Sequence, residues 1–119
     1  MKYLITTIAA VVLIGCKSTS THQAVFVGNI GAIKQHLNAG LDVEAKDDKF
    51  VGTFLHWASA GGQKEIVELL IAKGADVNAK NERDETPLDC GIKNKRSKIS
   101  DLLHKHGGKT GEELKAAGN

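Results

Sequence analysis

Aromatic residues and proline are both scarce in this chain of 119 residues. Phe, Trp and Tyr make up only 4% of the sequence, and Pro87 is the single proline. A core with so few rings must be built mainly from Leu, Ile, Val and Ala, which suits thin helical layers better than a β-sandwich. The near absence of proline also leaves helices uninterrupted. We therefore expect an all-α protein with one domain.

Runs of like charge are absent too. Lys and Arg number 16, Asp and Glu number 14, and the two signs are interspersed, which leaves a formal net charge of +2. A domain that binds nucleic acid usually carries a clustered basic face, so the charge pattern argues against such a partner. Hydrophobic residues make up 41% of the chain, which is typical of a folded globular domain.

The apolar run at residues 4–14 is too short to cross a membrane comfortably, because a spanning helix needs about 20 residues. It follows Lys2 and matches the apolar region of a secretory signal peptide. The run ends in the sequence Leu-Ile-Gly-Cys at residues 13–16, which resembles the lipobox of bacterial lipoproteins. That resemblance implies cleavage before Cys16, attachment of a diacylglycerol to its thiol and acylation of the new amino group.

The lipobox also implies where the protein works. Residues 1–15 would be a signal peptide and residues 16–20 a lipidated tether in front of a domain at residues 21–119. Two or more acyl chains anchor a protein stably, so we expect a lipid-anchored protein of the cell envelope. Lys17, rather than Asp, implies the periplasmic face of the outer membrane if the host is Gram-negative. An ordinary signal peptide with an incidental cysteine, and a Cys16–Cys90 disulfide, are the alternatives.

The remainder of the chain repeats itself with a period of about 33 residues. The sequence TPLD at residues 86–89 matches TFLH at 53–56, and ISDLL at 99–103 matches IVELL at 66–70. Residues 74–79 read GADVNA. These segments resemble the ankyrin repeat, whose pattern runs TPLHxAA, then IVxxLL, then GADVNA.

The resemblance implies a short ankyrin-repeat solenoid. Three helix-turn-helix repeats would occupy about residues 19–50, 51–83 and 84–106, with a C-terminal cap at residues 107–119. One such unit cannot bury its own apolar face, so the core closes only when neighbouring units stack.

Local residue choices agree with these boundaries. Thr86 can cap a helix together with Asp89 at the third helical position, and Thr110 begins a second motif of this kind. Gly74 lies where a helix needs a left-handed cap. Asp84 takes a position that is usually glycine in the repeat, and Asp tolerates a positive φ angle better than most residues.

Four apolar residues lie at positions that are commonly polar on ankyrin binding surfaces. The family binds through the inner side of its first helices, which corresponds here to Phe26 and Val27, and through its loop tips, which correspond to Phe50 and Val51. Clustered exposed apolar side chains usually mark an interaction site. We therefore predict that these four residues anchor a protein partner, flanked by the charged loop tip Glu82-Arg83-Asp84-Glu85. The alternative is that Phe26 covers the N-terminal edge and Phe50 folds back onto its own repeat.

Groups capable of catalysis are few and scattered. His22 and His56 match the histidine of the TPLH motif, which implies structural hydrogen bonds to threonine and backbone. His104 and His106 are two residues apart and so point to different faces of a helix, which disfavours a zinc site. Cys90 is expected to be a small buried residue inside a helix.

These observations favour a non-catalytic module: a monomeric, membrane-tethered adaptor, scaffold or inhibitor that binds a protein. We expect no cofactor, metal ion or small-molecule substrate, because three short repeats should leave no deep pocket. Trp57 is interpreted as packing between helices. A narrower alternative is an immunity or accessory protein for one periplasmic enzyme. A small enzyme or metal protein that uses His104, His106 or Cys90 is disfavoured.

Overall fold

The computed structural model describes residues 21–118, which form pairs of short helices joined by loops. The predicted signal peptide, Cys16 and the tether lie outside the described residues. The helices are α2 Thr21–Phe26, α3 Ile30–Asn38, α4 Phe54–Gly61, α5 Lys64–Ala72, α6 Pro87–Lys93, α7 Ser97–Lys105 and α8 Gly111–Ala116. Apart from one isolated bridge between Lys46 and Thr53, residues 21–118 contain no β-structure. The prediction of an all-α solenoid of three helix pairs is confirmed.

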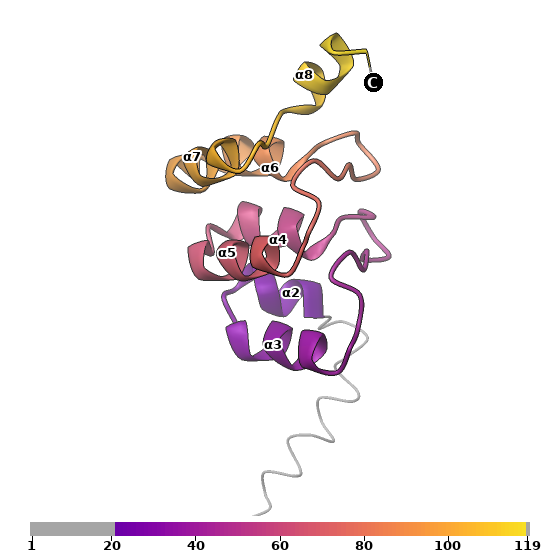
Figure 1. Cartoon of the computed structure of the whole chain (residues 1–119), viewed down its shortest axis with the longest axis vertical. Coiled ribbons are helices and arrows are strands. Elements are labelled where there is room, and N and C mark those ends of the chain that lie inside the picture. The colour runs from indigo at the N-terminus through magenta and orange to yellow at the C-terminus, as the bar shows by residue number, and fades with distance from the viewer. Residues whose placement is uncertain (1–20, 119) are drawn as a thin grey trace, which may run out of the picture.

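The pairs α2–α3, α4–α5 and α6–α7 stack on one another along the long axis of the molecule (Figure 1). The first helices of the pairs make the most extensive contacts, with α4 packed between α2 and α6. The loops that enter α4 and α6 both project to the same side of the stack (Figure 1). We call residues 39–53 the first finger loop and residues 73–86 the second.

The helix ends follow the signals expected from the sequence. The hydroxyls of Thr53, Thr86 and Thr110 each accept a hydrogen bond from the third residue of the helix that follows, and that residue's side chain accepts from the threonine N–H. These capping boxes satisfy backbone groups that a helix start otherwise leaves unpaired. Gly74 has φ 92° after α5, and Asp84 has φ 60° in the second finger loop, as predicted.

The core consists of Leu, Ile and Val side chains between the stacked pairs, together with one aromatic ring. Phe54, which replaces the proline of the ankyrin pattern, is fully buried. Its ring stacks on His22 with centroids 4.2 Å apart and meets the edge of His36 at 4.7 Å. The substitution therefore joins the second repeat to both helices of the first.

The segment after α7 turns at Gly107 and continues into α8, which lies beyond the last helix pair (Figure 1). Two hydrogen bonds attach it to α6: the Thr86 hydroxyl donates to the Lys109 carbonyl at 2.6 Å, and the Gly111 N–H donates to the Asp89 carboxylate at 2.8 Å. Ile92 on α6 is still 52% exposed. The outer end of the stack is thus only partly covered.

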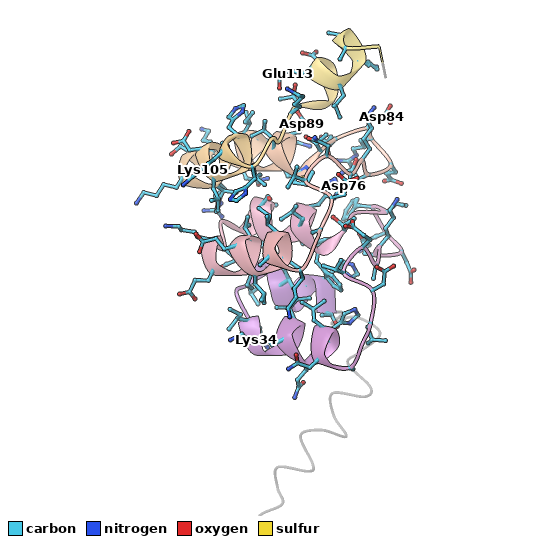
Figure 2. All side chains as sticks on the ribbon, viewed as in Figure 1. Lys34, Asp76, Asp84, Asp89, Lys105 and Glu113 are labelled. Carbon is cyan, nitrogen blue, oxygen red and sulfur yellow. The ribbon has the colours of Figure 1, made fainter. Side chains whose placement is uncertain are left out.

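Charged side chains of both signs surround the stack. Figure 2 shows Lys34 and Lys105 on the side of the second helices and Asp84 on the side of the finger loops. Among residues 21–118, none of the helices has the length and apolar character needed to cross a bilayer.

Gly61 packs against the backbone of Phe26 and provides a test of how the first two repeats pack. A Cβ atom there would overlap with the carbonyl oxygen of Phe26, so Gly61→Ala should lower the free energy of unfolding by about 1–3 kcal/mol. Gly31 in α3 is the matched control, because its nearest neighbour would lie at an ordinary 3.4 Å. Gly31→Ala should be stabilising by roughly 0.5–1 kcal/mol, since alanine favours helix. Urea denaturation followed by circular dichroism measures both; equal stability of the two variants would contradict this packing.

Candidate protein-binding surface

A buried histidine in each of the first two repeats, His22 and His56, bonds to the finger loop that follows that repeat. The Thr53 N–H donates to His56 Nδ1 at 3.0 Å, and His56 Nε2 lies 2.8 Å from the carbonyl oxygen of Glu85. Because Nδ1 accepts this hydrogen bond it carries no proton, so Nε2 carries the proton of the ring and donates a hydrogen bond to that carbonyl. His22 Nε2 contacts the Ala45 carbonyl at 2.8 Å in the same way. The predicted bonds to threonine and to backbone both occur for His56, and the bond to backbone occurs for His22.

Burial is the main reason that the pKa values of His22 and His56 lie below 6.5, the ordinary value for histidine. Both rings are therefore neutral at neutral pH, which suits their use as hydrogen-bonding struts. Through these hydrogen bonds the two histidines fix the position of the finger-loop backbone at Ala45 and Glu85. His56 holds the backbone of Glu85, at the base of the second finger loop, against α4.

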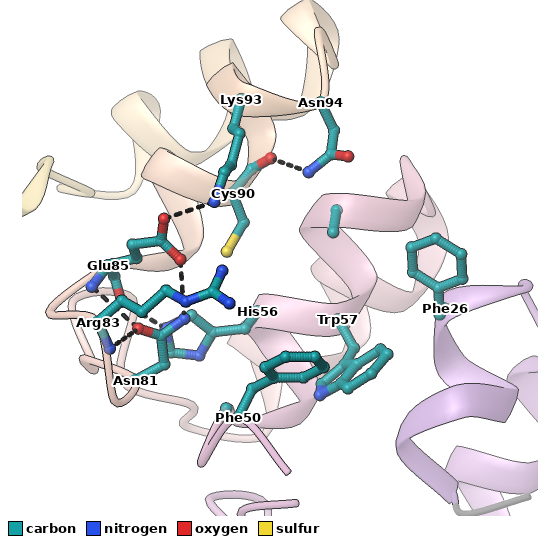
Figure 3. Close-up of a pocket in the computed structure, with 12 residues that line it drawn as sticks. Phe26, Phe50, His56, Trp57, Asn81, Arg83, Glu85, Cys90, Lys93 and Asn94 are labelled. Atoms are coloured by element: carbon teal, nitrogen blue, oxygen red, sulfur yellow. Dashed lines mark hydrogen bonds and ion pairs between the residues drawn. The ribbon is translucent and has the colours of Figure 1, made fainter.

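The surface between the finger loops and the first helices is hollowed. We call this the inner hollow; its volume is about 360 Å³, it is open to solvent, and its lining comes from α2, both finger loops, α4 and α6. Trp57 contacts Phe26 edge-on with ring centroids 6.0 Å apart and Phe50 at 5.9 Å (Figure 3). Phe26 and Phe50 remain 37% and 36% exposed. Three aromatic rings therefore form one wall of an accessible cavity.

The first finger loop is folded around the carboxylate of Asp47. One oxygen accepts the N–H groups of Lys49 and Phe50 at 2.9 and 2.7 Å. The other accepts the Gly52 N–H at 2.8 Å and the indole N–H of Trp57 at 3.0 Å. Partial burial acts to raise the pKa of Asp47, but these hydrogen bonds outweigh it and hold the pKa below its usual value. The carboxylate thus orients both Phe50 and Trp57.

Charged groups line the side of the hollow formed by the second finger loop and α6. Glu85 accepts from Lys93 Nζ at 2.7 Å and from the Asn81 amide at 3.1 Å, and the bond from Lys93 is the main cause that lowers the pKa of the carboxyl. The guanidinium of Arg83 lies over the Phe50 ring, 5.5 Å from its centroid (Figure 3). Within residues 21–118, the one salt bridge is that of Lys93 with Glu85. Arg83 forms no salt bridge there, but its charge also helps to lower the pKa of Glu85.

The structure brings together four of the eight residues predicted to bind a partner. Phe26, Phe50, Arg83 and Glu85 line the inner hollow. The others lie outside its lining, with Val27 72% and Val51 38% exposed and Glu82 and Asp84 on the exposed part of the second finger loop. Phe26 and Phe50 both contact Trp57 and both stay partly exposed. Each ring can therefore pack against the repeats and still be available to a partner.

The sequence interpretation missed the role of Trp57. Its ring does pack against the core, as predicted, but it also lies in the hollow and contacts both phenyl rings. Lys93, which lies at a variable position of a first helix in the ankyrin pattern, was not among the eight predicted residues but also lines the hollow. The sequence interpretation did not foresee the hollow itself, which is open to solvent and has a volume at the lower end of the range for small-molecule sites.

The groups considered for catalysis lie apart. His104 and His106 are exposed at the end of α7, and no cluster of three or more His, Cys, Asp or Glu residues suited to a metal occurs in the part of the chain that the structure describes. Cys90 lines the hollow but is only 8% exposed. Burial is the main cause that raises the pKa of its thiol to about 12, so the reactive thiolate is not populated at neutral pH.

Stacked helix pairs with finger loops around a shared hollow define this chain as a helical repeat protein. A family model for ankyrin repeats in three copies matches residues 21–113, so the chain belongs to the ankyrin-repeat family. Ankyrin repeats support a protein-interaction module, and the family is generally non-catalytic.

Curated relatives share the repeats and are much longer proteins. The chain is 33% identical to Rabankyrin-5 of Mus musculus over 106 residues, which are 77% of this chain and 9% of that protein. It is 47% identical to Ankyrin repeat and IBR domain-containing protein 1 of Homo sapiens over 51 residues, 43% of this chain and 5% of the relative. It is 37% identical to Palmitoyltransferase AKR1 of Debaryomyces hansenii over 74 residues, which are 62% of this chain and 9% of that protein. The similarity therefore covers less than a tenth of each relative.

Asp47 provides a test of how the aromatic wall is built. Asp47→Ala leaves the loop N–H groups and the Trp57 indole N–H without their acceptor, which should cost about 1–3 kcal/mol. Trp57 is the sole tryptophan of the chain, so its fluorescence reports on this wall directly and should shift to the red as the ring becomes more hydrated. Asp48→Ala, at the exposed neighbouring residue, is the control and should leave the spectrum unchanged. An unaltered spectrum in both variants would mean that Asp47 does not organise the loop.

Proposed function

We propose that this protein is a lipid-tethered, non-catalytic binding module of the bacterial cell envelope, which holds a protein partner close to the membrane through the inner hollow. The observation that carries the proposal is the exposed aromatic wall of Phe26, Phe50 and Trp57. Partly exposed rings that form one concave surface are typical of protein interfaces, where aromatic and arginine side chains contribute most of the binding energy.

The hollow also has the polar groups that an interface needs for orientation. Arg83, Lys93 and Glu85 surround the rings on one side. Arginine is favoured at interfaces because its planar guanidinium forms several hydrogen bonds at once. An apolar wall with a charged rim supports recognition of a protein segment.

The location rests on the lipobox resemblance at residues 13–16. A diacylated Cys16 would anchor the protein stably. About five residues separate it from Thr21, so the tether would reach roughly 15–20 Å when extended. A partner would accordingly be a membrane protein or a protein recruited to the membrane surface.

Lipid anchoring is tested with the two cysteines of the chain as a matched pair. Cys16→Ala removes the acylation site and should move the protein from the membrane fraction to the soluble fraction and abolish incorporation of labelled palmitate. Cys90→Ala changes a buried thiol and should leave both readouts unchanged. Continued tight membrane association of Cys16→Ala would contradict lipid anchoring.

Partner binding is tested by crosslinking the full chain in its own membranes. Phe26→Ser and Phe50→Ser should each reduce crosslinked partner about tenfold, which corresponds to the loss of roughly 1.4 kcal/mol from an aromatic anchor. Leu41→Ser is the control, because Leu41 is 52% exposed but lies outside the hollow. Thermal melts confirm that each variant folds. Undiminished crosslinking in the folded phenylalanine variants would exclude the hollow as the binding surface.

A further inference from the structure

The aromatic wall of the inner hollow can hold an apolar group but offers it no hydrogen bond. The indole N–H of Trp57 is already donated to Asp47 at 3.0 Å. The two phenyl rings have no polar atoms, and the small residues Gly52 and Ala60 complete the lining beside them. A side chain that enters here gains contact area only, so an aromatic or branched aliphatic side chain is favoured.

The part of the lining that comes from the second finger loop and α6 has more cations than carboxylates. Its charged side chains are two cations, Arg83 and Lys93, and one carboxylate, Glu85. Both oxygens of Glu85 are engaged, one by Lys93 at 2.7 Å and the other by Asn81 at 3.1 Å. Arg83 lines the hollow and forms no salt bridge within residues 21–118, although its charge also helps to lower the pKa of Glu85.

The position of Arg83 decides between two kinds of ligand. Three aromatic rings are also the usual means of binding a quaternary ammonium group, through cation–π attraction. Here the guanidinium already lies over Phe50, 5.5 Å from the ring centroid, and would repel a second cation. A carboxylate is attracted instead and can accept two parallel hydrogen bonds from the guanidinium.

From these complementary walls we infer that the inner hollow binds an extended segment of a partner protein in which an aromatic or branched aliphatic side chain lies next to an Asp or Glu. The apolar side chain packs against Phe50 and Trp57, and the carboxylate pairs with Arg83. The lining extends from Phe26 in the first repeat to Asn94 in the third, a span that suits an extended segment. We assign the carboxylate to an Asp or Glu side chain within this extended segment rather than to the C-terminus of the partner. This inference rests on the proposed function and specifies its ligand.

The test uses the purified full chain and capped six-residue peptides without tryptophan. Three peptides differ only at their two central positions, which are Phe-Glu, Phe-Lys or Ser-Glu. Because Trp57 is the sole tryptophan and lines the hollow, its fluorescence reports binding. The Phe-Glu peptide should bind about fivefold tighter than Phe-Lys, the range expected for an exposed ion pair, and about tenfold tighter than Ser-Glu. Added salt should reduce the preference for Phe-Glu over Phe-Lys.

Arg83 variants connect the preference to the guanidinium. Arg83→Gln should remove the preference for Glu over Lys, and Arg83→Glu should reverse it. Lys98→Gln is the matched control, because Lys98 is an exposed cation on α7 outside the hollow, and it should retain the preference. Equal or tighter binding of Phe-Lys by the unaltered protein would overturn the inference, as would a preference that Arg83→Glu does not change. Absence of binding by all three peptides up to about 10 mM, the limit of weak affinity, would overturn it as well.

The same variants in membranes separate this inference from the proposed function. Partner crosslinking that is lost in Phe50→Ser but unchanged in Arg83→Glu would retain the binding module and overturn the charged ligand. If the peptides show the expected preferences but neither Phe50→Ser nor Arg83→Glu changes crosslinking in membranes, the ligand chemistry would stand. The proposal that the hollow holds a partner at the membrane would then be overturned. A crosslinked product that consists only of a second copy of this chain would overturn the assignment of a different protein as the ligand.

Discussion

The hydrogen bonds of His56 determine how one repeat is placed on the next. Its Nδ1 accepts the N–H of Thr53 at the start of α4, and its Nε2 donates to the carbonyl of Glu85 in the following loop. The ring is buried, so these bonds form out of water, where an unpaired group would be costly. Since Glu85 is thereby fixed at the base of the second finger loop, its carboxylate reaches Lys93, and Arg83, two residues earlier, lies over the first loop.

Features controlled by neighbouring residues were predictable from the sequence. The capping boxes at Thr86 and Thr110 and the positive φ angles of Gly74 and Asp84 depend on a few adjacent residues, and each occurs as expected. The aromatic wall was only partly predictable. Trp57 meets Phe50 because Asp47 folds the inserted loop back onto the indole, and that depends on hydrogen bonds between residues ten positions apart. Likewise, the pairing of Lys93 with Glu85 depends on the geometry of the third repeat.

Departures from the repeat pattern have two different physical meanings in this chain. Phe54 replaces a proline, and its ring is fully buried between two histidines of the first repeat. Phe50 belongs to the loop with one extra residue and remains accessible beside Trp57. Both are phenylalanines at atypical positions, four residues apart, yet one completes the core and the other faces solvent. Only the position of the residue relative to the stack distinguishes them.

The exposed Ile92 has a consequence for how such a chain can grow. It corresponds to Ser59 of the middle repeat, which is fully buried. Thr86 and Asp89 already bond to the backbone at Lys109 and Gly111, much as His56 bonds to the backbone at Glu85. A duplicated repeat inserted after α7 would therefore meet an apolar position and two polar attachment points already in place. An inserted repeat would have to take over these two bonds from the C-terminal segment and cover Ile92.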